Sequence, residues 1–334
     1  MNAKTQPQSR GASRMLRKLP VVALGALLAM PMSAHAMRIA FGDVPSIESL
    51  NLLVAIERAK ERGVDANLTH FDSEDVAAQA VVGQEADMGV GAPYALIQRV
   101  GTPIRMVYQL STLQFFPVVN SERYQGWEDL DGETVAVHSR GSGTEALMRL
   151  MADKHGIEYA NISYVPGSEV RAGGLLQGNI HASIVDSASW RLLQDEGGGQ
   201  FQRLPVEDVN ATDEALYASQ EYVENNPEDV RILMEEMLRT WREINENPEV
   251  VADLRDEYDL LPDLPSQMED ELVPFYRDSA ESGLFPNDGG DAEAVQADLQ
   301  FYAIGGQIEG DPAELDLENF WNFEPLQQAR QNLD

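Results

Sequence analysis

Short apolar runs and helical segments alternate along this 334-residue chain, and after residue 36 the alternating pattern occurs twice. The helical segments carry apolar residues three and four positions apart and end at glycines such as Gly63, Gly83 and Gly156. Strands separated by helices of this length predict parallel pairing with right-handed crossovers. We therefore predict an α/β fold with two open, doubly wound lobes. The expected strands are residues 38–41, 66–71, 88–91, 104–110, 134–138, 162–165 and 182–185.

The last third of the chain has a different pattern, which is helical throughout. One apolar stripe at helical spacing runs from Val230 to Ile244, and further helices are expected at residues 249–258, 266–282 and 292–304. No long linker interrupts the pattern. We predict two lobes that are linked near residues 117–126 and followed by a helical C-terminal tail.

The first 36 residues have the pattern of an export signal. Five basic residues and no acidic ones precede or flank an apolar run of 12 residues from Leu19 to Met30, and the segment ends in Ala34-His35-Ala36. A membrane anchor is the alternative, but 12 residues are short for about 30 Å of hydrocarbon. The sequence has no cysteine, which excludes a lipid-modified cysteine at the cleavage site. We expect cleavage after Ala36 and a soluble, monomeric protein in a bacterial periplasm.

The charge of the chain restricts its partners. The formal net charge is −32, and it becomes −37 when residues 1–36 with their five basic residues are removed. Such an acidic chain has no electrostatic footprint for nucleic acid and would be repelled by anionic lipid. Self-repulsion of this size is reduced in concentrated salt, so we expect a halophilic source; an acidic protein from an ordinary organism is the alternative. Without cysteines there is no disulfide, thiolate metal site or cysteine nucleophile.

The candidate binding residues follow from the predicted topology. Ligands of open α/β sheets bind at the carboxyl ends of strands, beside helix N-termini. The loops at these ends are residues 42–46, 72–73, 91–94, 139–144, 166–170 and 186–189, and they meet in one cleft if the lobes face each other. The ligand-binding candidates from these loops and from the crossing between the lobes are Asp43, Ser46, Ser73, Gly91, Ala92, Tyr94, Phe116, Ser139, Gly141, Ser142, Gly143, Thr144, Glu169 and Asp186.

The most distinctive of these loops is Ser139-Arg140-Gly141-Ser142-Gly143-Thr144, which follows a predicted strand and opens a helix. Its glycines allow a tight turn, and the free N–H groups at the start of the helix favour an anion. Arg140 and then Arg171 are the nearest full positive charges. The alternative is a plain turn in which serine or threonine caps the helix. Phe116 and its neighbour Phe115 could likewise stack on a ligand or pack in the hinge.

The sequence gives little support to an enzyme. His70, His138, His155 and His181 lack metal-ligand spacing, and there is no Gly-x-Ser-x-Gly nucleophile motif. We therefore predict no catalytic residue, no metal site and no cofactor. A secreted α/β hydrolase that uses Asp186, His138 or Glu169 is kept as the less favoured alternative.

Several segments resemble one family when they are taken in order. The stretches Gly126–Thr144 and Ala80–Pro93 resemble conserved segments of periplasmic solute-binding proteins, as do Gly101–Ile104, Leu216–Ser219 and Asn226–Glu228. The subgroup binds aliphatic sulfonates, taurine, nitrate or thiamine-precursor pyrimidines. The similarity runs from about Met37 to Pro248. It implies a type II periplasmic binding protein, a two-lobed Venus-flytrap fold that closes on a small ligand.

The resemblance also implies the domain boundaries and the partners. The C-terminal helices are expected to return to the first lobe, so residues 37–117 and 215–334 form lobe 1 and residues 118–214 form lobe 2. The partners are a small-molecule ligand and the cognate ABC permease in the inner membrane. Fungal relatives that synthesise a pyrimidine use cysteines, so that activity is excluded here.

The ligand itself stays open at this point, because the sequence departs from the family pattern. Gly178-Asn-Ile-His181-Ala182 replaces the usual Gly-x-x-Asp-Ala, and the loop at residues 42–46 lacks the usual aromatic residue. The main hypothesis is a small organic anion like a sulfonate, taurine or nitrate. The alternative is a pyrimidine or other nitrogen heterocycle, with Asp43, Glu169 and Asp186 as acceptors and Tyr94, Phe116 or Trp190 stacking on the ring.

Overall fold

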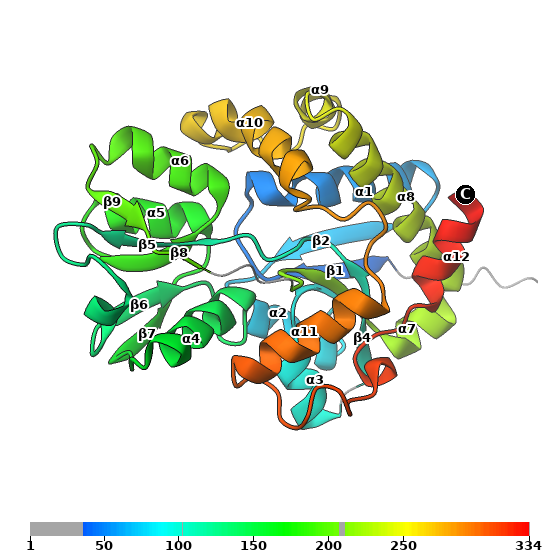
Figure 1. Ribbon diagram of the computed structural model, residues 1–334. Coiled ribbons are helices and arrows are strands. Elements are labelled where there is room, and N and C mark those ends of the chain that lie inside the picture. Colours follow the sequence, from blue (N-terminus) through cyan, green and yellow to red (C-terminus); the bar gives the residue numbers. More distant parts are fainter. Residues whose placement is uncertain (1–35, 102, 207–210, 334) are drawn as a thin grey trace, which may run out of the picture. The chain divides into compact units, whose positions relative to one another are not determined.

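The computed structural model describes residues 36–101, 103–206 and 211–333. The predicted signal segment therefore lies outside the described residues, apart from Ala36. Within the described residues, no helix has both the length and the apolar character needed to cross a membrane. The described chain contains two mixed sheets of five strands, each covered by helices on both faces (Figure 1).

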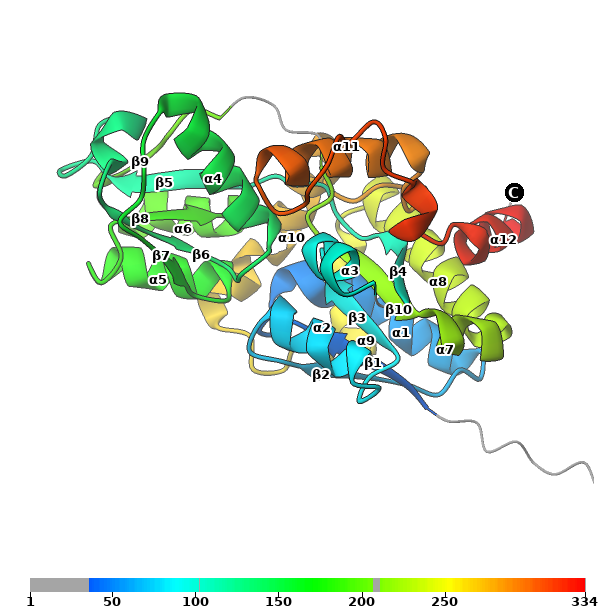
Figure 2. The same ribbon diagram turned by 90° about the horizontal axis from the view of Figure 1, so that it is seen from below.

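The first sheet has the strand order β2-β1-β3-β10-β4. The pairs β1–β2 and β1–β3 are parallel, whereas β10 is antiparallel to both β3 and β4. Helices α1 and α8 cover one face and α2 and α3 the other (Figures 1 and 2). The strands are β1 (Met37–Phe41), β2 (Ala66–His70), β3 (Met88–Gly91), β4 (Ile104–Gln109) and β10 (Ala215–Ser219); the helices are α1 (Leu50–Glu61), α2 (Glu74–Val82), α3 (Tyr94–Val100) and α8 (Pro227–Glu246), with a 3-10 turn η1 (Ile47–Ser49) before α1.

The second sheet repeats this arrangement with the order β7-β6-β8-β5-β9. Here β6 is parallel to β7 and β8, and β5 is antiparallel to β8 and β9. Helix α4 lies on one face of the sheet, and α5 and α6 lie on the other (Figure 1). The elements are β5 (Phe116–Asn120), η2 (Trp127–Leu130), β6 (Thr134–Val137), α4 (Gly143–His155), β7 (Asn161–Tyr164), α5 (Ser168–Leu176), β8 (Ala182–Val185), α6 (Ser187–Glu196) and β9 (Phe201–Arg203).

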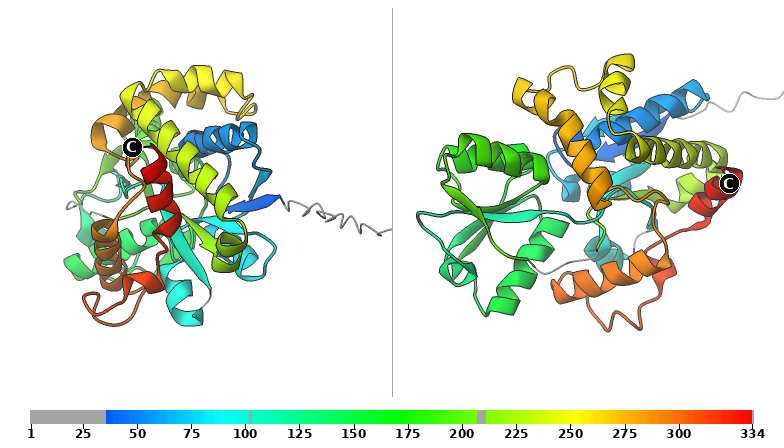
Figure 3. Two further views of the ribbon diagram at one scale, coloured as in Figure 1. Left: turned by 90° about the vertical axis from the view of Figure 1, so that its right-hand side faces the viewer. Right: turned by 45° about the horizontal axis from the view of Figure 1, so that its top comes forward.

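The C-terminal third packs on the first lobe. Helix α12 lies along α8, as both views in Figure 3 show, and Arg330 donates hydrogen bonds to Asp288 O and Gly290 O. The remaining elements are α7 (Gln220–Asn225), α9 (Val250–Glu257), α10 (Ser266–Ser282), α11 (Ala292–Ile304), η3 (Leu317–Asn319) and α12 (Glu324–Leu333). The predicted helices at residues 249–258, 266–282 and 292–304 are thus confirmed within one residue at each end.

Two features of the predicted topology are corrected. The expectation of parallel pairing holds for β1–β3 and β6–β8, but β10 and β5 are antiparallel strands inserted beside β3 and β8. Residues 116–120 are therefore a strand of the second sheet and not part of the link. The chain passes from the first sheet to the second through residues 110–115 and returns after β9. Antiparallel insertion is invisible to strand–helix alternation, because β5 and β10 are not followed by crossover helices of their own.

The core is divided between the sheet faces. One large apolar cluster joins the first sheet to α1, α8 and α10, and Trp241 is its largest side chain. A second cluster joins the opposite face to α11 and continues onto α4 of the second lobe through Leu113, Ala146 and Tyr302. Burial of such side chains contributes about 25 cal/mol per Å² of apolar surface. The apolar contact between α11 and α4 holds the two lobes together on one side of the strand ends.

Candidate functional site

The carboxyl ends of the parallel strands in both sheets meet around a small cavity, which we call the inner cavity. Its volume is about 20 Å³, enough for about one water molecule. The first lobe contributes the loop after β1 and the start of α2, the second lobe contributes the ends of β6 and β7, and the crossing segments close it. Its lining residues are Asp43, Glu48, Glu74, Phe115, His138, Ser142, Thr144, Ser168, Arg171, Asp213 and Glu214.

Carboxylates dominate the charge of the inner cavity, which has five of them against one arginine and one histidine. Burial raises the pKa of Glu74, and burial together with neighbouring carboxylates raises the pKa of Asp213 and Glu214 well above their usual range. Beside the cavity, burial raises the pKa of Glu169 to about 7. The neutral carboxyl forms are therefore favoured, and a positive charge placed here would be attracted as these groups ionise.

His138 joins the two lobes at the centre of the cavity. It follows β6 of the second sheet, yet its Nε2 lies 3.1 Å from Gly42 O, which follows β1 of the first. Its Nδ1 lies 3.6 Å from Asp43 Oδ2, and its Nε2 lies 3.7 Å from Glu74 Oε1. The imidazole thus bridges carbonyl and carboxylate oxygens of the first lobe.

Arg171 is the buried cation of the cavity, with 1% of its surface exposed. Its Nε donates to Ile184 O, and its Nη1 donates to Val165 O, both at 2.9 Å. These two bonds hold the carboxyl end of β8 to the residue after β7. Because the guanidinium has five N–H donors, others stay available toward the carboxylates of the cavity.

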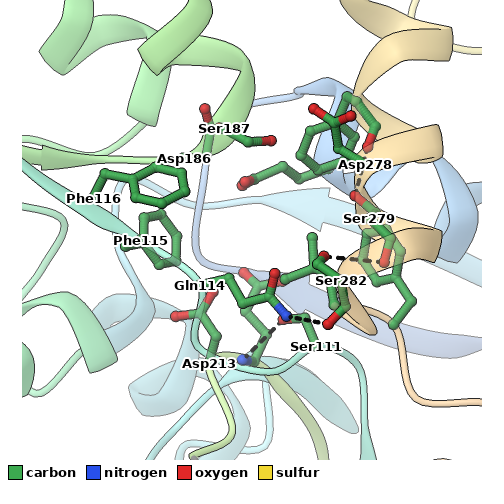
Figure 4. A pocket seen from close by; sticks show the side chains of 15 residues that line it. Ser111, Gln114, Phe115, Phe116, Asp186, Ser187, Asp213, Asp278, Ser279 and Ser282 are labelled. Carbon is green, nitrogen blue, oxygen red and sulfur yellow. Dashed lines mark hydrogen bonds between the residues drawn. The ribbon is translucent and has the colours of Figure 1, made fainter. Parts of the chain in front are cut away.

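A larger cavity of about 170 Å³ adjoins the inner cavity, and we call it the hinge-side cavity (Figure 4). Phe115 and Phe116 line one side, Asp278 and Ser279 of α10 line the other, and Asp186 lies between them (Figure 4). The other lining residues include Glu48, Asp213, Glu214, Phe275 and Phe285. A cavity of this size accommodates a six-membered ring, since an engineered protein cavity of about 150 Å³ binds benzene.

Glu48 and Asp186 meet across the lobes in this cavity. Glu48 comes from η1 of the first lobe, whereas Asp186 is the N-cap of α6 in the second and accepts from Ser189 N at 2.6 Å. Burial and a hydrogen bond with Asp186 raise the pKa of Glu48 well above its usual range. Such a contact between two carboxyl groups needs a proton or another positive charge between them.

The turn at residues 139–144 is a helix cap in this structure. The Ser142 hydroxyl accepts from Glu145 N and Ser139 N, and it donates to Ser139 O. Gly141 N donates to Glu145 Oε2 at 2.7 Å. Gly143 packs closely, because a Cβ there would lie 2.8 Å from Leu113 Cδ1 and 3.1 Å from Asp213 Oδ1. These backbone donors are therefore already used within the chain, and a carboxylate stands beside the turn.

The other predicted residues divide between the cavities and the protein interior. Asp43, Ser142 and Thr144 line the inner cavity, and Phe116 and Asp186 line the hinge-side cavity. Tyr94 belongs to the core of the first lobe, where its hydroxyl contacts Asp298 and accepts from Trp321 Nε1. Ser46, Ser73, Ser139, Gly143 and Glu169 lie close to these strand ends in sequence but are not among the residues that line either cavity.

Gly91 and Ala92 surround the carboxylate of Glu74. Ala92 N donates to Glu74 Oε2 at 3.1 Å. Gly91 has a φ of 139°, and a Cβ there would lie 2.7 Å from the same oxygen. Only glycine adopts this backbone conformation readily and admits the carboxylate so closely.

Sequence reasoning missed four residues of these cavities, Glu74, Asp213, Glu214 and Asp278, as binding candidates. Glu74 directly follows the predicted Ser73, so extending that loop by one residue would have included it. Asp213 and Glu214 precede β10, whose return to the first sheet the pattern did not predict. Asp278 lies within α10, and no local signal shows that this helix faces the cavity.

The described residues offer no site for a metal ion, because no group of three or more His, Asp or Glu side chains is arranged to hold one. Nor does His138 contact a serine hydroxyl within that part of the chain; its contacts are with Gly42, Asp43 and Glu74. A nucleophile-and-base pair would need such a contact. The site is a set of hydrogen-bonding and charged groups that surround enclosed space.

Comparison with known proteins now places the chain. The sequence model of the NMT1/THI5-like family matches residues 46–251, which is more than half of the chain. The chain belongs to the NMT1/THI5-like family. A search of curated proteins finds no match. The cavities described above lie among the strand ends that this family match covers, except for the part contributed by α10 and the residues after it.

Solved structures share the fold of this NMT1/THI5-like protein at low sequence identity. The periplasmic nitrate-binding protein NrtA from Synechocystis PCC 6803 has a TM-score of 0.68 at 14% identity, covering 90% of each chain. A ligand-binding component of an ABC-type import system from Staphylococcus aureus has a TM-score of 0.66 at 12% identity, covering 88% of this chain and 99% of that one. The alkanesulfonate-binding protein SsuA from Xanthomonas axonopodis pv. citri has a TM-score of 0.61 at 16% identity, covering 82% and 94%. The common fold is the two-lobed periplasmic binding protein fold.

Proposed function

We propose that this chain is the extracytoplasmic substrate-binding component of an ABC importer. Its family and its two-lobed fold support this function, because the nitrate-binding, alkanesulfonate-binding and ABC-import proteins named above share the fold. The observation that carries the proposal is the pair of cavities that both lobes line with polar groups at their strand ends. A binding role needs no nucleophile, which agrees with the surroundings of His138.

The same proposal includes the processing and the domains of the chain. Residues 1–36 act as the signal peptide, and the mature protein is a periplasmic monomer that delivers its ligand to the cognate permease. Lobe 1 comprises residues 37–117 and 215–334, and lobe 2 comprises residues 118–214. The membership of β5 in the second sheet and of β10 in the first supports these boundaries within a few residues.

For the ligand, the geometry favours a small nitrogen heterocycle that carries a positive charge or several N–H donors. Five carboxylates line the inner cavity, and Glu48 and Asp186 meet in the hinge-side cavity. The phenyl rings of Phe115 and Phe116 offer flat apolar surface, and aromatic faces attract cations. A protonated ring nitrogen would take the place of the proton between Glu48 and Asp186.

The second candidate is the small organic anion of the main sequence hypothesis. The names of the nitrate-binding and alkanesulfonate-binding relatives in structure support it, and Arg171 would supply its positive charge. Such an anion would have to be held beside Asp213 and Glu214. It would therefore bind together with protons, which would keep these carboxyl groups neutral.

A thermal-shift screen in concentrated salt separates the two candidates. The panel contains aminopyrimidines, quaternary ammonium compounds, alkanesulfonates, taurine and nitrate. A ligand present at 100 times its dissociation constant adds about 2.7 kcal/mol to the free energy of unfolding. We expect the nitrogen bases to give the largest shift; a shift with sulfonates or nitrate alone would favour the anion, and no shift with any compound would count against a receptor for these classes.

Two variants locate the binding site. Asp186→Asn keeps a side chain that can cap α6 but removes the negative charge from the hinge-side cavity, so the affinity for a cation should fall at least tenfold. Asp195→Asn removes the same charge from an exposed position on the same helix and serves as the control. Equal affinities of these two variants would contradict the placement of the ligand.

A further inference from the structure

A third cavity, of about 390 Å³, lies between α2 and α3 of the first lobe and the N-terminal part of α4 in the second, and we call it the outer pocket. Its walls are partly apolar, with Pro93, Leu96 and Val100 among the lining residues. Glu74 lines both this pocket and the inner cavity, and its carboxylate is held by Ala92 N. The outer pocket is thus a separate space that shares one wall with the site proposed above.

The charges around the outer pocket are unevenly satisfied. Its carboxylates already accept hydrogen bonds: Glu74 from Ala92 N, Asp75 from the Ser73 hydroxyl, and Glu145 from Gly141 N. Of its three arginines, Arg149 pairs with Glu145 at 2.7 Å. Within the described residues Arg99 has no ion pair, and Arg140 has only the ring of Tyr164, 4.9 Å from its guanidinium carbon.

Two unpaired arginines at one pocket are unusual in this chain. It has 56 acidic residues against 24 basic ones, and most of the arginines that the structure describes are paired with carboxylates, as Arg38, Arg58 and Arg62 illustrate. Arg99 extends from α3 and Arg140 from the turn before α4. A single anion between them would therefore contact both lobes.

Two buried polar atoms in the same pocket also lack partners. The Tyr217 hydroxyl and Gln307 Oε1 have no hydrogen-bond partner within the described residues. Tyr217 is fully buried and Gln307 is 8% exposed, so neither atom is satisfied by bulk water. Unsatisfied buried polar atoms cost free energy, and a ligand hydroxyl could donate to Gln307 Oε1 or accept from Tyr217.

We propose that the outer pocket is a second ligand site, for a small monocarboxylate with an apolar body and a hydroxyl group. The carboxylate binds Arg99 and Arg140, the apolar body covers Leu96 and Val100, and the hydroxyl group bonds with Gln307 or Tyr217. Because the two arginines belong to different lobes, the bound acid favours the arrangement in which the lobes are together. This site goes beyond the proposed transport function and does not depend on which ligand fills the inner cavity.

The test uses 4-hydroxybenzoate as the probe and measures its dissociation constant by ligand-observed NMR at fixed ionic strength, because salt screens exposed arginines. Two related compounds separate the contributions: 4-methylphenol lacks the charge, and benzoate lacks the hydroxyl group. We expect 4-hydroxybenzoate to bind best of the three. No saturable binding of 4-hydroxybenzoate up to about 10 mM, or equal binding of 4-methylphenol, would overturn the proposal.

Variants of the pocket complete the test. Arg99→Gln and Arg140→Gln should each weaken binding of 4-hydroxybenzoate about tenfold. Arg123→Gln makes the same charge change at an exposed position outside the pocket and should leave the affinity within about twofold. Tyr217→Phe removes a hydroxyl that has no partner, so it should preserve folding and reduce the preference over benzoate. Unchanged affinity in both arginine variants would contradict the site.

Discussion

The two lobes have the same strand order but different chemistry at the strand ends. In the first lobe the ends carry carboxylates, Asp43, Glu48 and Glu74, and none of the arginines that line the inner cavity. In the second lobe the ends carry hydroxyl groups together with His138 and Arg171. The fold therefore determines where side chains meet, whereas the residue types determine what they can bind.

This difference explains why the lobes contact each other as they do. The cationic or neutral groups of the second lobe face the acidic groups of the first, as His138 faces Asp43 and Glu74. Where both lobes present a carboxyl group, at Glu48 and Asp186, a proton or a ligand has to intervene. The predictions below alter one lobe at a time, and they run from the largest expected effect to the smallest.

Replacing Arg171 should have the largest effect. Arg171→Met removes two hydrogen bonds within the second lobe and leaves the neighbouring carboxylates of both lobes without their buried cation. Removal of one partner from a buried ionic group costs about 3–5 kcal/mol. Urea denaturation should show a loss of this size. Arg123→Met, at an exposed position of the same lobe, should change the free energy of unfolding by less than about 0.5 kcal/mol; similar losses in both variants would refute the role of Arg171.

Glu169 should make stability depend on pH in the opposite direction from an ordinary surface carboxylate. Its pKa in the folded protein is about 7, above the value of about 4.3 in an unfolded chain. The folded state therefore holds the extra proton between these pH values, and its contribution to stability is present at low pH and lost as the pH rises through about 7. Glu169→Gln should be more stable than the parent at pH 8 by about 2 kcal/mol, after allowance for partial exposure.

The control for this prediction is the same comparison at about pH 4, where both forms of the side chain are neutral. There the two proteins should differ little in their free energies of unfolding. A stabilisation by Glu169→Gln that is equal at both pH values would show that packing, and not ionisation, is responsible.

Ser142→Ala should affect stability more than ligand affinity. Ser142 is the N-cap of α4, and removal of a serine cap costs about 1 kcal/mol. If the turn at residues 139–144 held the anionic end of a ligand, the same substitution would also weaken binding. We expect thermal unfolding at a lower temperature and a dissociation constant within about twofold of the parent for the best ligand of the screen.

The ion pairs of Arg191 should have a smaller effect on stability. Arg191 on α6 of the second lobe contacts Glu271 at 2.6 Å and also Asp278, both on α10 of the first. Arg191→Gln should reduce the free energy of unfolding by about 0.5–1 kcal/mol and increase the radius of gyration measured by small-angle scattering without ligand. Lys154→Gln, at an exposed position on α4, is the matched control; equal radii for both variants would show that Arg191 does not hold the lobes together.

The smallest effect for each charge, summed over the whole chain, is the response to salt. With a net charge of −32, the melting temperature should rise between about 0.1 and 2 M NaCl as repulsion is screened. A neutral osmolyte serves as the control for general exclusion effects on apolar surface. A flat or falling melting curve in salt would refute the halophilic hypothesis.

The sequence was sufficient to predict the fold and most of the strand ends. Periodicity predicted β3, β8 and α10 with their observed bounds, because each has a clear apolar pattern between turn residues. It failed for β5 and β10, whose positions depend on pairing with distant strands. Local pattern contains no information about such pairing.

The site was predicted less completely than the fold, for physical reasons. Asp43, Phe116 and Asp186 were found because they directly follow or begin strands, whereas Asp278 enters the hinge-side cavity from a helix far along the chain. Tyr94 was selected by its position after β3, but its side chain turns into the core toward Asp298. Position at a strand end can be predicted from sequence; the direction of a side chain depends on packing partners that only the structure supplies.

The most direct test of the account measures the charge of the ligand at these cavities. The best ligand from the thermal-shift screen is titrated calorimetrically near pH 7 in two buffers with different enthalpies of ionisation. The account predicts a nitrogen base that releases about one proton from the buried carboxyl groups on binding, with affinity that falls at least tenfold in Asp186→Asn. An anion that binds with uptake of protons, and with the same affinity in Asp186→Asn, would contradict it.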